Sequence, residues 1–310
     1  MNRCPITYDE LKDGFYSKKG LNLLNPALKD LKPFPYNKAE QLAEARKRMT
    51  KMSIQGIQPK MSAQLSIKET CFIPVDRHGI YILKPEILHY PEVPQNEDLS
   101  MRIATSVGIE VPLHGLIYAK DQSMLYFIRR FDRKGKKGKI HTEDFAQISA
   151  KDRDTKYNYS MEKVAKLIDE YCTFPAIEKV KLFRRTLLSF LIGNEDMHLK
   201  NFSIIHENGR ISLSPAYDIL NTWIVLSAAR EELALTLKGK KSNFTRKQLI
   251  NYYGKERLKL SDKIIDKLLL QFEHSSINIW PNLIQNSFLS SEMKEKYADL
   301  VQERFSRLFG

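Results

Sequence analysis

The stretch from Leu191 to Ile205, LIGNEDMHLKNFSII, places a dense cluster of polar side chains between two apolar runs. Within it, Asp196 and Asn201 stand in a D-x-x-x-x-N spacing, and Asp218 follows in the later segment AYDI. Phosphoryl transfer from ATP needs such a set: one carboxylate acts on the acceptor hydroxyl, while a second carboxylate and an amide oxygen hold Mg²⁺. The spacing is common by chance, so a solvated, capped loop is the alternative interpretation.

Two upstream features favour the chemical interpretation. Lys84 ends the apolar segment GIYILK, where a phosphate-binding lysine is found in kinases. The segment from Ser53 to Lys60, SIQGIQPK, can form a turn whose backbone N–H groups cover phosphates. It has one glycine, Gly56, so taken alone it favours an ordinary β-turn. The chain order nevertheless matches that of kinases: a phosphate loop, then a lysine, then an acid-rich loop, and finally an aspartate that binds the metal.

Hydrophobic period and capping residues predict the elements that position these side chains. A short helix is expected after its N-cap Asn37, and another from about Asn96, with Gly108 as its C′ residue. The rest of the first 130 residues is expected to be mostly strands, with a hairpin around Asp121–Gln122. The first 36 residues, broken by prolines, are expected to be irregular.

The pattern then becomes mainly helical. One helix is expected to start at Ser160 and a longer one to end at Gly193, and the polar cluster then leads into a hairpin with its turn at Asn208–Gly209. From Thr245 to the end the pattern is again helical. A β-rich first part followed by a helical second part indicates an α+β fold.

Bulk composition restricts the class of protein without identifying a partner. The chain has 310 residues, enough for two lobes, and three well-separated cysteines, which indicate free thiols in a reducing compartment. No apolar run is long enough to span a bilayer. A net charge of +13 favours an anionic partner but also fits a merely basic chain, and no direct nucleic-acid site is predicted. Five histidines show no metal-binding spacing and are expected at surface or core positions: His78, His89, His114, His141 and His206.

Several segments together resemble the HipA toxin kinases: SIQGIQPK, YILKPE, RRFDR with HTEDFAQ, GNEDMHLKNFS and YDI. The resemblance covers roughly residues 50 to 310, and GNEDMHLKN is its most specific element. It implies a bilobed, protein-kinase-like α+β fold, with a β-rich N-lobe over residues 1–131 and a mostly helical C-lobe over residues 132–310. Only some fifty residues precede Ser53, which is similar to HipT, the short kinase of HipBST toxin–antitoxin systems. In such a system a small antitoxin, HipS, would supply the missing N-terminal subdomain, alongside a DNA-binding HipB-like protein.

The resemblance also implies roles for individual residues. Asp196 is expected to be the catalytic aspartate, Asn201 and Asp218 the Mg²⁺ ligands, and Lys84 a phosphate contact. The family usually has an acidic residue where this chain has Arg129, so backbone contacts to adenine are expected there. The remaining nucleotide-binding positions are the phosphate loop Gln55, Gly56, Ile57, Gln58, Pro59 and Lys60, the hinge Arg129, Arg130 and Phe131, and Gln147, His198, Lys200 and Tyr217.

Ser53 is a regulatory candidate because HipA-like kinases autophosphorylate at the start of this loop. A phosphate there would add about two negative charges beside a loop that has to hold ATP, and would repel the nucleotide or eject the loop. HipT proteins often carry a Ser-x-Ser pattern here, but Gln55 takes the second place in this chain, so Ser53 is the one site expected. A strand-end serine without a role is the alternative.

The leading hypothesis is an ATP- and Mg²⁺-dependent serine/threonine protein kinase that acts as a bacterial toxin. The resemblance implies an aminoacyl-tRNA synthetase as its substrate and a cytoplasmic location, with export to another cell left open. One alternative is a phosphatidylinositol-type lipid kinase, which has a related D-x-H-x-x-N arrangement. The other is a catalytically silent binding module, against which the intact set Lys84, Asp196, Asn201 and Asp218 argues.

Overall fold

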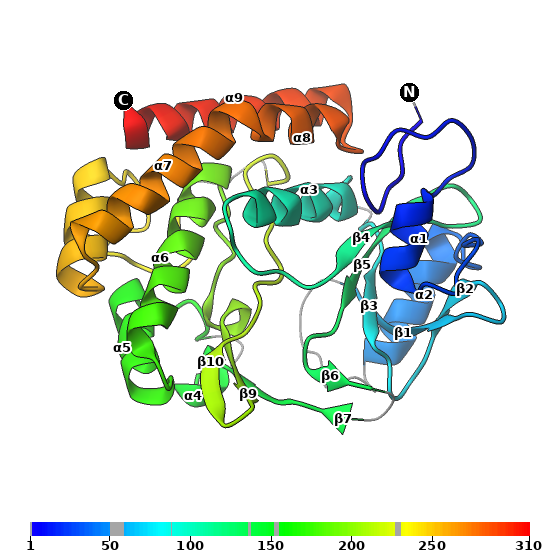
Figure 1. Ribbon diagram of the computed structural model, residues 1–310, viewed down its shortest axis with the longest axis horizontal. Helices are drawn as coiled ribbons and strands as arrows, with labels where there is room; N and C mark the ends of the chain where they lie inside the picture. Colours follow the sequence, from blue (N-terminus) through cyan, green and yellow to red (C-terminus); the bar gives the residue numbers. More distant parts are fainter. Residues whose placement is uncertain (1, 50–58, 88, 136–137, 152–154, 227–230) are drawn as a thin grey trace. The chain divides into compact units, whose positions relative to one another are not determined.

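The computed structural model describes residues 2–49, 59–87, 89–135, 138–151, 155–226 and 231–310. Figure 1 shows the chain coloured along its sequence. The chain divides into two units. The first unit comprises Met1–Leu99, Pro112–Gly138 and Asn286–Leu289. The second comprises Ser100–Val111, Lys139–Gln285 and Ser290–Gly310.

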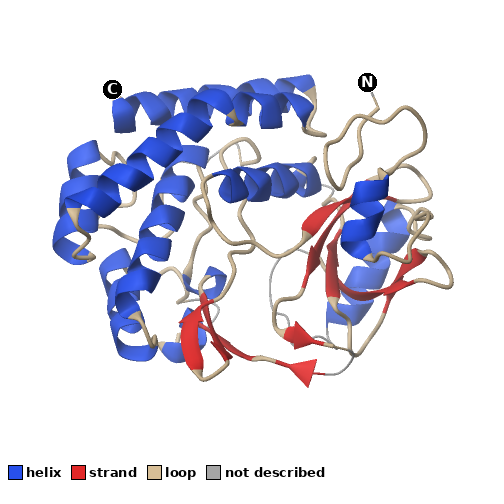
Figure 2. Cartoon of the chain, viewed as in Figure 1, coloured by secondary structure: helices blue, strands red, loops and turns tan. Residues whose placement is uncertain are grey.

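A five-stranded antiparallel sheet forms the centre of the first unit (Figure 2). Its strand order is β2-β1-β3-β5-β4, so β1 pairs with both β2 and β3. The hairpin predicted around Asp121–Gln122 is confirmed, because β4 and β5 pair on either side of it. The strands are β1 Met61–Ser66, β2 Cys71–Pro74, β3 Tyr81–Lys84, β4 His114–Tyr118 and β5 Met124–Arg129.

The core of the first unit lies between this sheet and two helices beside it, α1 (Lys18–Leu24) and α2 (Lys38–Met49) (Figure 1). Successive strand residues point to opposite faces, so alternate positions share one face. The sheet contributes such alternating pairs to the core: Met61 and Ala63, Tyr81 and Leu83, Leu125 and Phe127.

The prediction of an irregular N-terminal segment is wrong for α1. Ser17 caps this helix by accepting the Gly20 N–H at 3.0 Å. A Cβ at Gly20 would lie 2.9 Å from Sγ of Cys4, so the helix can approach its neighbour only with glycine there. The predicted cap Asn37 is confirmed: it exchanges hydrogen bonds with Glu40 in a capping box at the start of α2. With two helices before its sheet, the N-terminal part contains more helix than predicted.

The helix α3 spans Val93–Ser106 and thus begins earlier than the predicted Asn96. Pro94 lies in its first turn, where a missing N–H costs nothing because that group has no partner within the helix. Gly108, with φ of 74°, follows the end of the helix as predicted. Residues up to Leu99 belong to the first unit and the rest of α3 to the second.

The second unit contains a three-stranded antiparallel sheet with the order β10-β9-β8. Its strands are β8 His141–Asp144, β9 Ser203–Glu207 and β10 Arg210–Leu213. The predicted turn is confirmed, since Asn208 and Gly209 both adopt positive φ, 52° and 73°, as a two-residue hairpin turn requires. The short strands β6 (Arg133–Lys134) and β7 (Gly138–Lys139) pair with each other.

Two predicted helix ends position the loop of interest. Ser160 caps α5 (Met161–Tyr171) by accepting the Lys163 N–H, and α6 (Pro175–Ile192) ends at Gly193. Gly193 has φ of 67°, and a Cβ there would lie 2.5 Å from Cδ2 of Leu300, so both conformation and space require glycine. A short helix, α4 (Phe145–Ile148), follows β8 directly.

The predicted helical C-terminal part is also confirmed, with an unexpected start. The element η2 (Lys247–Arg257) is a π-helix, and at its end the Leu258 N–H donates to the Tyr253 carbonyl, five residues earlier, at 2.9 Å. The helices α7 (Asp262–Asn278), α8 (Trp280–Asn286) and α9 (Ser291–Phe309) follow. Over the described ranges, no helix has both the length and the apolar character needed to cross a bilayer.

Candidate active site

The polar loop between α6 and β9 is held by hydrogen bonds within the second unit. The side-chain oxygen of the buried Asn194 accepts the N–H of Asp196 at 3.1 Å. The N–H of Glu195 donates to Oγ1 of Thr222 at 3.0 Å, and that hydroxyl donates to the carbonyl of Gly193 at 2.8 Å. The backbone of Asp196 is therefore fixed relative to the end of α6.

The carboxylate of Asp196 is about half exposed and receives a hydrogen bond from a distant part of the chain. The donor is the phenol of Tyr157, which contacts Oδ1. Burial raises the pKa of Tyr157 above its usual value and the charge of Asp196 raises it further, so the phenol remains a donor at neutral pH. A carboxylate that is held on one side and open to solvent can accept a proton from an approaching hydroxyl group.

His198 lies beside this carboxylate and is buried. Its Nε2 is 2.7 Å from Nζ of Lys156 and 3.7 Å from Oδ1 of Asp196. Burial lowers the pKa of the imidazole, and Lys156 adds to this effect, whereas the charges of Asp196 and Asp218 oppose it. An ammonium group can only donate, so Nε2 accepts and Nδ1 carries the proton.

Asn201 is also tied to this loop. It ends the 3₁₀ turn η1 (Leu199–Asn201), and its Nδ2 donates to the carbonyl of Asp196 at 2.8 Å. The amide nitrogen is thus used within the loop, which leaves the side-chain oxygen as the group that could bind a cation. The hydroxyl of Tyr217 donates to the carbonyl of Lys200 at 2.8 Å and lies 2.5 Å from Oγ of Ser203, which connects the AYDI segment to the same turn.

Asp218 follows Tyr217 with φ of 54°, a left-handed conformation that aspartate adopts more readily than most residues other than glycine. Such a conformation persists only where the surrounding structure fixes it, and it is often found at functional sites. Burial raises the pKa of Tyr217, and the charges of Asp218 and Asp144 raise it further. The oxygens of Asn201 and Asp218 are the hard donors that Mg²⁺ prefers, and these residues therefore fit a magnesium site.

In the first unit, Lys84 forms a buried ion pair with Glu97. Nζ of Lys84 lies 2.6 Å from Oε1 of Glu97, and the side chains are only 4% and 2% exposed. Nζ also lies 5.6 Å from the ring centroid of Tyr126, the cross-strand neighbour of Lys84 on β5. Protein kinases hold their phosphate-binding lysine by such a pair with a helix glutamate. The sequence analysis missed Glu97, although an acidic pair in the first helix after β3 was an available signal.

The backbone of the predicted hinge is partly used by the sheet. The N–H groups of Arg129 and Arg130 donate to the carbonyls of Leu113 and Ile80, both at 2.8 Å. The guanidinium of Arg130 binds both carboxylate oxygens of Asp132, at 2.9 and 2.7 Å. Contacts from Arg129 and Arg130 to adenine would therefore have to come from their carbonyl groups. Phe131, the third predicted hinge residue, is partly buried.

Gln147 and Lys200, two predicted nucleotide contacts, both act on Asp144. Gln147 is exposed, and its Oε1 accepts the Asp144 N–H at 2.9 Å while its own N–H donates to Oδ1 of Asp144 at 2.8 Å. Burial raises the pKa of Asp144, an effect that Gln147 and the charge of Lys200 reduce. The side-chain oxygen of Gln147 thus caps α4, and only its amide nitrogen remains for a ligand.

Part of the predicted phosphate loop lies outside the described residues: Ser53, Gln55, Gly56, Ile57 and Gln58. The two described members, Pro59 and Lys60, directly precede β1 in the first unit. Pro59 is partly buried, and Lys60 is buried with 7% of its surface exposed.

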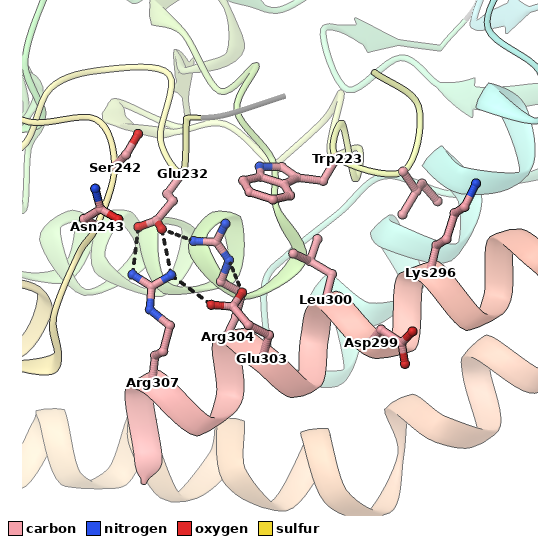
Figure 3. Close-up of a pocket in the computed structure, with 11 residues that line it drawn as sticks. Trp223, Glu232, Ser242, Asn243, Lys296, Asp299, Leu300, Glu303, Arg304 and Arg307 are labelled. Atoms are coloured by element: carbon pink, nitrogen blue, oxygen red, sulfur yellow. Dashed lines mark hydrogen bonds and ion pairs between the residues drawn. The ribbon is translucent and has the colours of Figure 1, made fainter. Parts of the chain in front are cut away.

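A hollow of about 670 Å³ in the second unit contains none of the predicted site residues (Figure 3). Its wall includes Glu232, which forms ion pairs with Arg304 and, at 2.7 Å, with Arg307. The carboxylate of Glu232 also accepts a hydrogen bond from the Phe244 N–H at 2.9 Å. The guanidinium of Arg304 lies 4.6 Å from the ring centroid of Trp223. The carboxylate of Glu232 is paired with the two arginines of the protein itself, and we assign no ligand to the hollow.

The antiparallel sheet with a buried Lys–Glu pair, together with the helical unit and its Asp/Asn loop, define a protein-kinase-like α+β fold. The model of the HipA-like C-terminal domain matches residues 52–280. The chain belongs to this family.

Related proteins carry kinase names. A putative kinase of Haemophilus influenzae is 33% identical over 237 residues, which cover 71% of this chain and 68% of that protein. The serine/threonine-protein kinase toxin HipA of Shewanella oneidensis is 26% identical over 190 residues, or 55% of this chain and 43% of that protein. The chain thus spans less than half the length of this second relative.

Solved structures confirm the predicted fold class. HipA from the Shewanella oneidensis complex of HipA, HipB and operator DNA matches with a TM-score of 0.71 and 18% identity, covering 90% of this chain and 73% of that one. The Helicobacter pylori proinflammatory kinase CtkA matches with a TM-score of 0.52 and 18% identity, covering 73% of this chain and 86% of that one.

Two residues beside Asp196 escaped the sequence analysis. Tyr157 and Lys156 lie about forty positions upstream of the loop, and Tyr157 contacts Asp196 while Lys156 contacts His198. No local motif marks them, because their position depends on how the segment before α5 folds back onto the loop. An alignment of relatives would be the natural place to look for such a signal.

Proposed function

We propose that this chain is an ATP-dependent serine/threonine protein kinase of the HipT type, the toxin of a HipBST-type toxin–antitoxin system. The observation that carries the proposal is the loop of the second unit. There Asp196 is half exposed and held by Tyr157, and Asn201 is tied to the Asp196 backbone. Tyr217, the neighbour of Asp218 in the chain, donates to the carbonyl of Lys200 in the same loop.

In this proposal each group has one task. Asp196 accepts the proton of the substrate hydroxyl, and the hydrogen bond from Tyr157 keeps its carboxylate oriented. Asn201 and Asp218 hold Mg²⁺, which when bound neutralises the charge on the phosphates. Lys84, kept in place by Glu97, contacts phosphate oxygens. Neutral His198 adds no positive charge that would compete for the two carboxylates.

In this proposal the hinge Arg129–Phe131 contacts adenine and Gln147 lies near the nucleotide. The phosphate loop is residues 55–60, with Ser53 as its autophosphorylation site. The proposed protein substrate is an aminoacyl-tRNA synthetase, whose phosphorylation would stop tRNA charging in the cytoplasm. A HipS-like small protein and a HipB-like DNA-binding protein are the proposed partners. The presence of HipB and DNA with the Shewanella HipA structure, and the family membership, support this assignment.

Phosphopeptide mapping of a cell lysate after brief expression tests the proposal. We expect new phosphopeptides from an aminoacyl-tRNA synthetase and from Ser53 itself, and none of them with the matched variant Asp196→Asn. Equal phosphopeptide sets for the two proteins would contradict the assignment. In a second experiment the protein is incubated with labelled ATP and phosphatidylinositol vesicles. A labelled lipid product would identify a lipid kinase instead.

A further inference from the structure

Three potential metal-ligating side chains meet on one face of the β8–β9 pair, and none of the three is among the residues assigned above. His141 and Glu143 are two positions apart on β8, so their side chains share one face of the strand. His206 lies on β9 directly opposite His141. The two imidazole rings have centroids 4.5 Å apart. The sequence analysis saw no metal spacing among the histidines, because these two are separated by 65 positions (206 minus 141) and only the strand register joins them.

The distances between the donor atoms suit a tetrahedral ion. Oε2 of Glu143 lies 3.2 Å from Nε2 of His141 and 3.7 Å from Nε2 of His206. All three donor atoms lie within 4.8 Å of one another. Ligands about 2.0 Å from a tetrahedral ion are about 3.3 Å apart, so small side-chain rotations would bring all three into the first coordination sphere.

One donor atom in particular lacks a partner. Nε2 of His206 is buried from solvent and makes no hydrogen bond within the described residues, although the imidazole edge faces Glu143. A buried polar nitrogen without a hydrogen bond is costly unless something else satisfies it. A cation bound between the two imidazoles and the carboxylate would satisfy this atom and both of its neighbours.

We propose that His141, Glu143 and His206 form a binding site for a divalent transition-metal ion, with Zn²⁺ the best fit. Two imidazole nitrogens and one carboxylate oxygen are a ligand set that Zn²⁺ uses, with the fourth position left to water or to a ligand from another molecule. Mg²⁺ and Ca²⁺ prefer oxygen ligands and would bind here weakly. The site is therefore chemically distinct from the oxygen-rich set of Asn201 and Asp218.

A bound ion would join the edge strand β8 to the central strand β9 at the first residue of β8. The strand is only four residues long and leads directly into Asp144 and its capping box with Gln147. As an edge strand, β8 forms sheet hydrogen bonds with β9 only. A metal ion bound to both strands would add a second connection between them. Zn²⁺ should accordingly stabilise β8 locally.

Zinc titration of the full chain tests this proposal, in the presence of saturating Mg²⁺ to occupy oxygen-ligand sites. All proteins in this experiment carry Cys71→Ser, which removes a partly exposed thiol that could itself bind Zn²⁺. We expect one Zn²⁺ per chain in isothermal titration calorimetry. His141→Ala and His206→Ala should each weaken binding by at least about tenfold, since even outer-shell partners are worth that much. His274→Ala, which removes an exposed histidine on α7, is the matched control and should leave binding unchanged.

Hydrogen exchange supplies a second readout that does not depend on kinase activity. Zn²⁺ should slow amide exchange in β8 of the Cys71→Ser protein and of the His274→Ala control, and should not do so in His206→Ala. The proposal is overturned if no Zn²⁺ binds, or if the affinity is the same in the His141, His206 and His274 variants. Unchanged circular dichroism of the variants would show that any loss of binding is not a loss of fold.

Discussion

Replacing Glu97 by glutamine removes the negative partner of Lys84 while keeping the shape of the side chain. The ion pair is 2.6 Å long and nearly inaccessible to water, so the lysine cannot exchange its partner for solvent. Breaking a buried pair from one side typically costs about 3–5 kcal/mol, because one charge stays behind in the protein interior.

The lysine can limit this cost by losing its proton. At pH 7.4, deprotonating a lysine with an ordinary pKa of about 10.4 costs about 4 kcal/mol, and at pH 9.4 only about 1.4 kcal/mol. We therefore expect Glu97→Gln to lower the free energy of unfolding by about 3–4 kcal/mol at pH 7.4. The unfolded variant would then bind one proton more than the folded one, so its stability should rise with pH and the deficit should narrow toward pH 10.

Urea denaturation followed by far-ultraviolet circular dichroism, together with hydrogen exchange in β3 and α3, measures this effect. The tryptophans lie in the second unit, so their fluorescence would not report on the first. The matched control is Glu69→Gln, which neutralises an exposed glutamate of the same unit. In the double variant Lys84→Met/Glu97→Gln, part of the stability should return, because neither position then carries a buried charge. A Glu97→Gln protein that matches the Glu69→Gln control at every pH would refute the reasoning.

Three further predictions concern the second unit. Gly193→Ala should lower the free energy of unfolding by at least about 1–2 kcal/mol, because alanine disfavours the left-handed conformation and its Cβ would press on the side chain of Leu300 in α9. Urea denaturation followed by tryptophan fluorescence measures this change. A loss below about 0.5 kcal/mol would contradict the prediction. Burial depresses the pKa of His198 below its ordinary value of about 6.5, so the unfolded chain binds the proton more readily. The contribution of this residue to stability is therefore present above about pH 6.5 and is lost as the pH falls. His198→Asn should flatten the fall in urea midpoint between about pH 7.5 and 5.5, and an identical pH profile would count against it. Tyr157→Phe removes a hydrogen bond to a charged group, worth about 1.5–3 kcal/mol of stability. It should also reduce the kcat/KM of phosphate transfer by roughly tenfold or more, because Asp196 loses the donor that orients it. An unaltered rate would show that the phenol does not position Asp196.

Local signals in the sequence predicted the ends of elements well. Ser160 as a cap, Gly193 as a left-handed helix end and the Asn208–Gly209 turn all act through their own backbone conformation or a neighbour a few residues away. The helix α1 was missed because it is short and contains Gly20, a residue that weakens helices, although its cap Ser17 was a readable signal. The π-helical hydrogen bonds of η2 were equally hidden, because hydrophobic period does not separate them from an α-helix.

Features that depend on distant parts of the chain could not be predicted. Pairing of β1 with both β2 and β3 is a property of the whole sheet. Tyr157, the donor to Asp196, comes from a segment whose approach no short motif specifies. His141 and His206 likewise lie opposite each other only because of the register in which β8 and β9 pair. Residue types led to the hypothesis of phosphoryl transfer at the loop, but tertiary packing determines which groups surround it.

The central claim is that Asp196 and Asp218 carry out phosphate transfer together, and the most direct test is the initial rate of γ-phosphate transfer from labelled ATP in the presence of Mg²⁺. The control is Asp266→Asn, which neutralises an exposed aspartate on α7 of the same unit. The account predicts that Asp196→Asn and Asp218→Asn each reduce the rate by at least about a hundredfold, while the control keeps the wild-type rate. Wild-type rates in both active-site variants would contradict it.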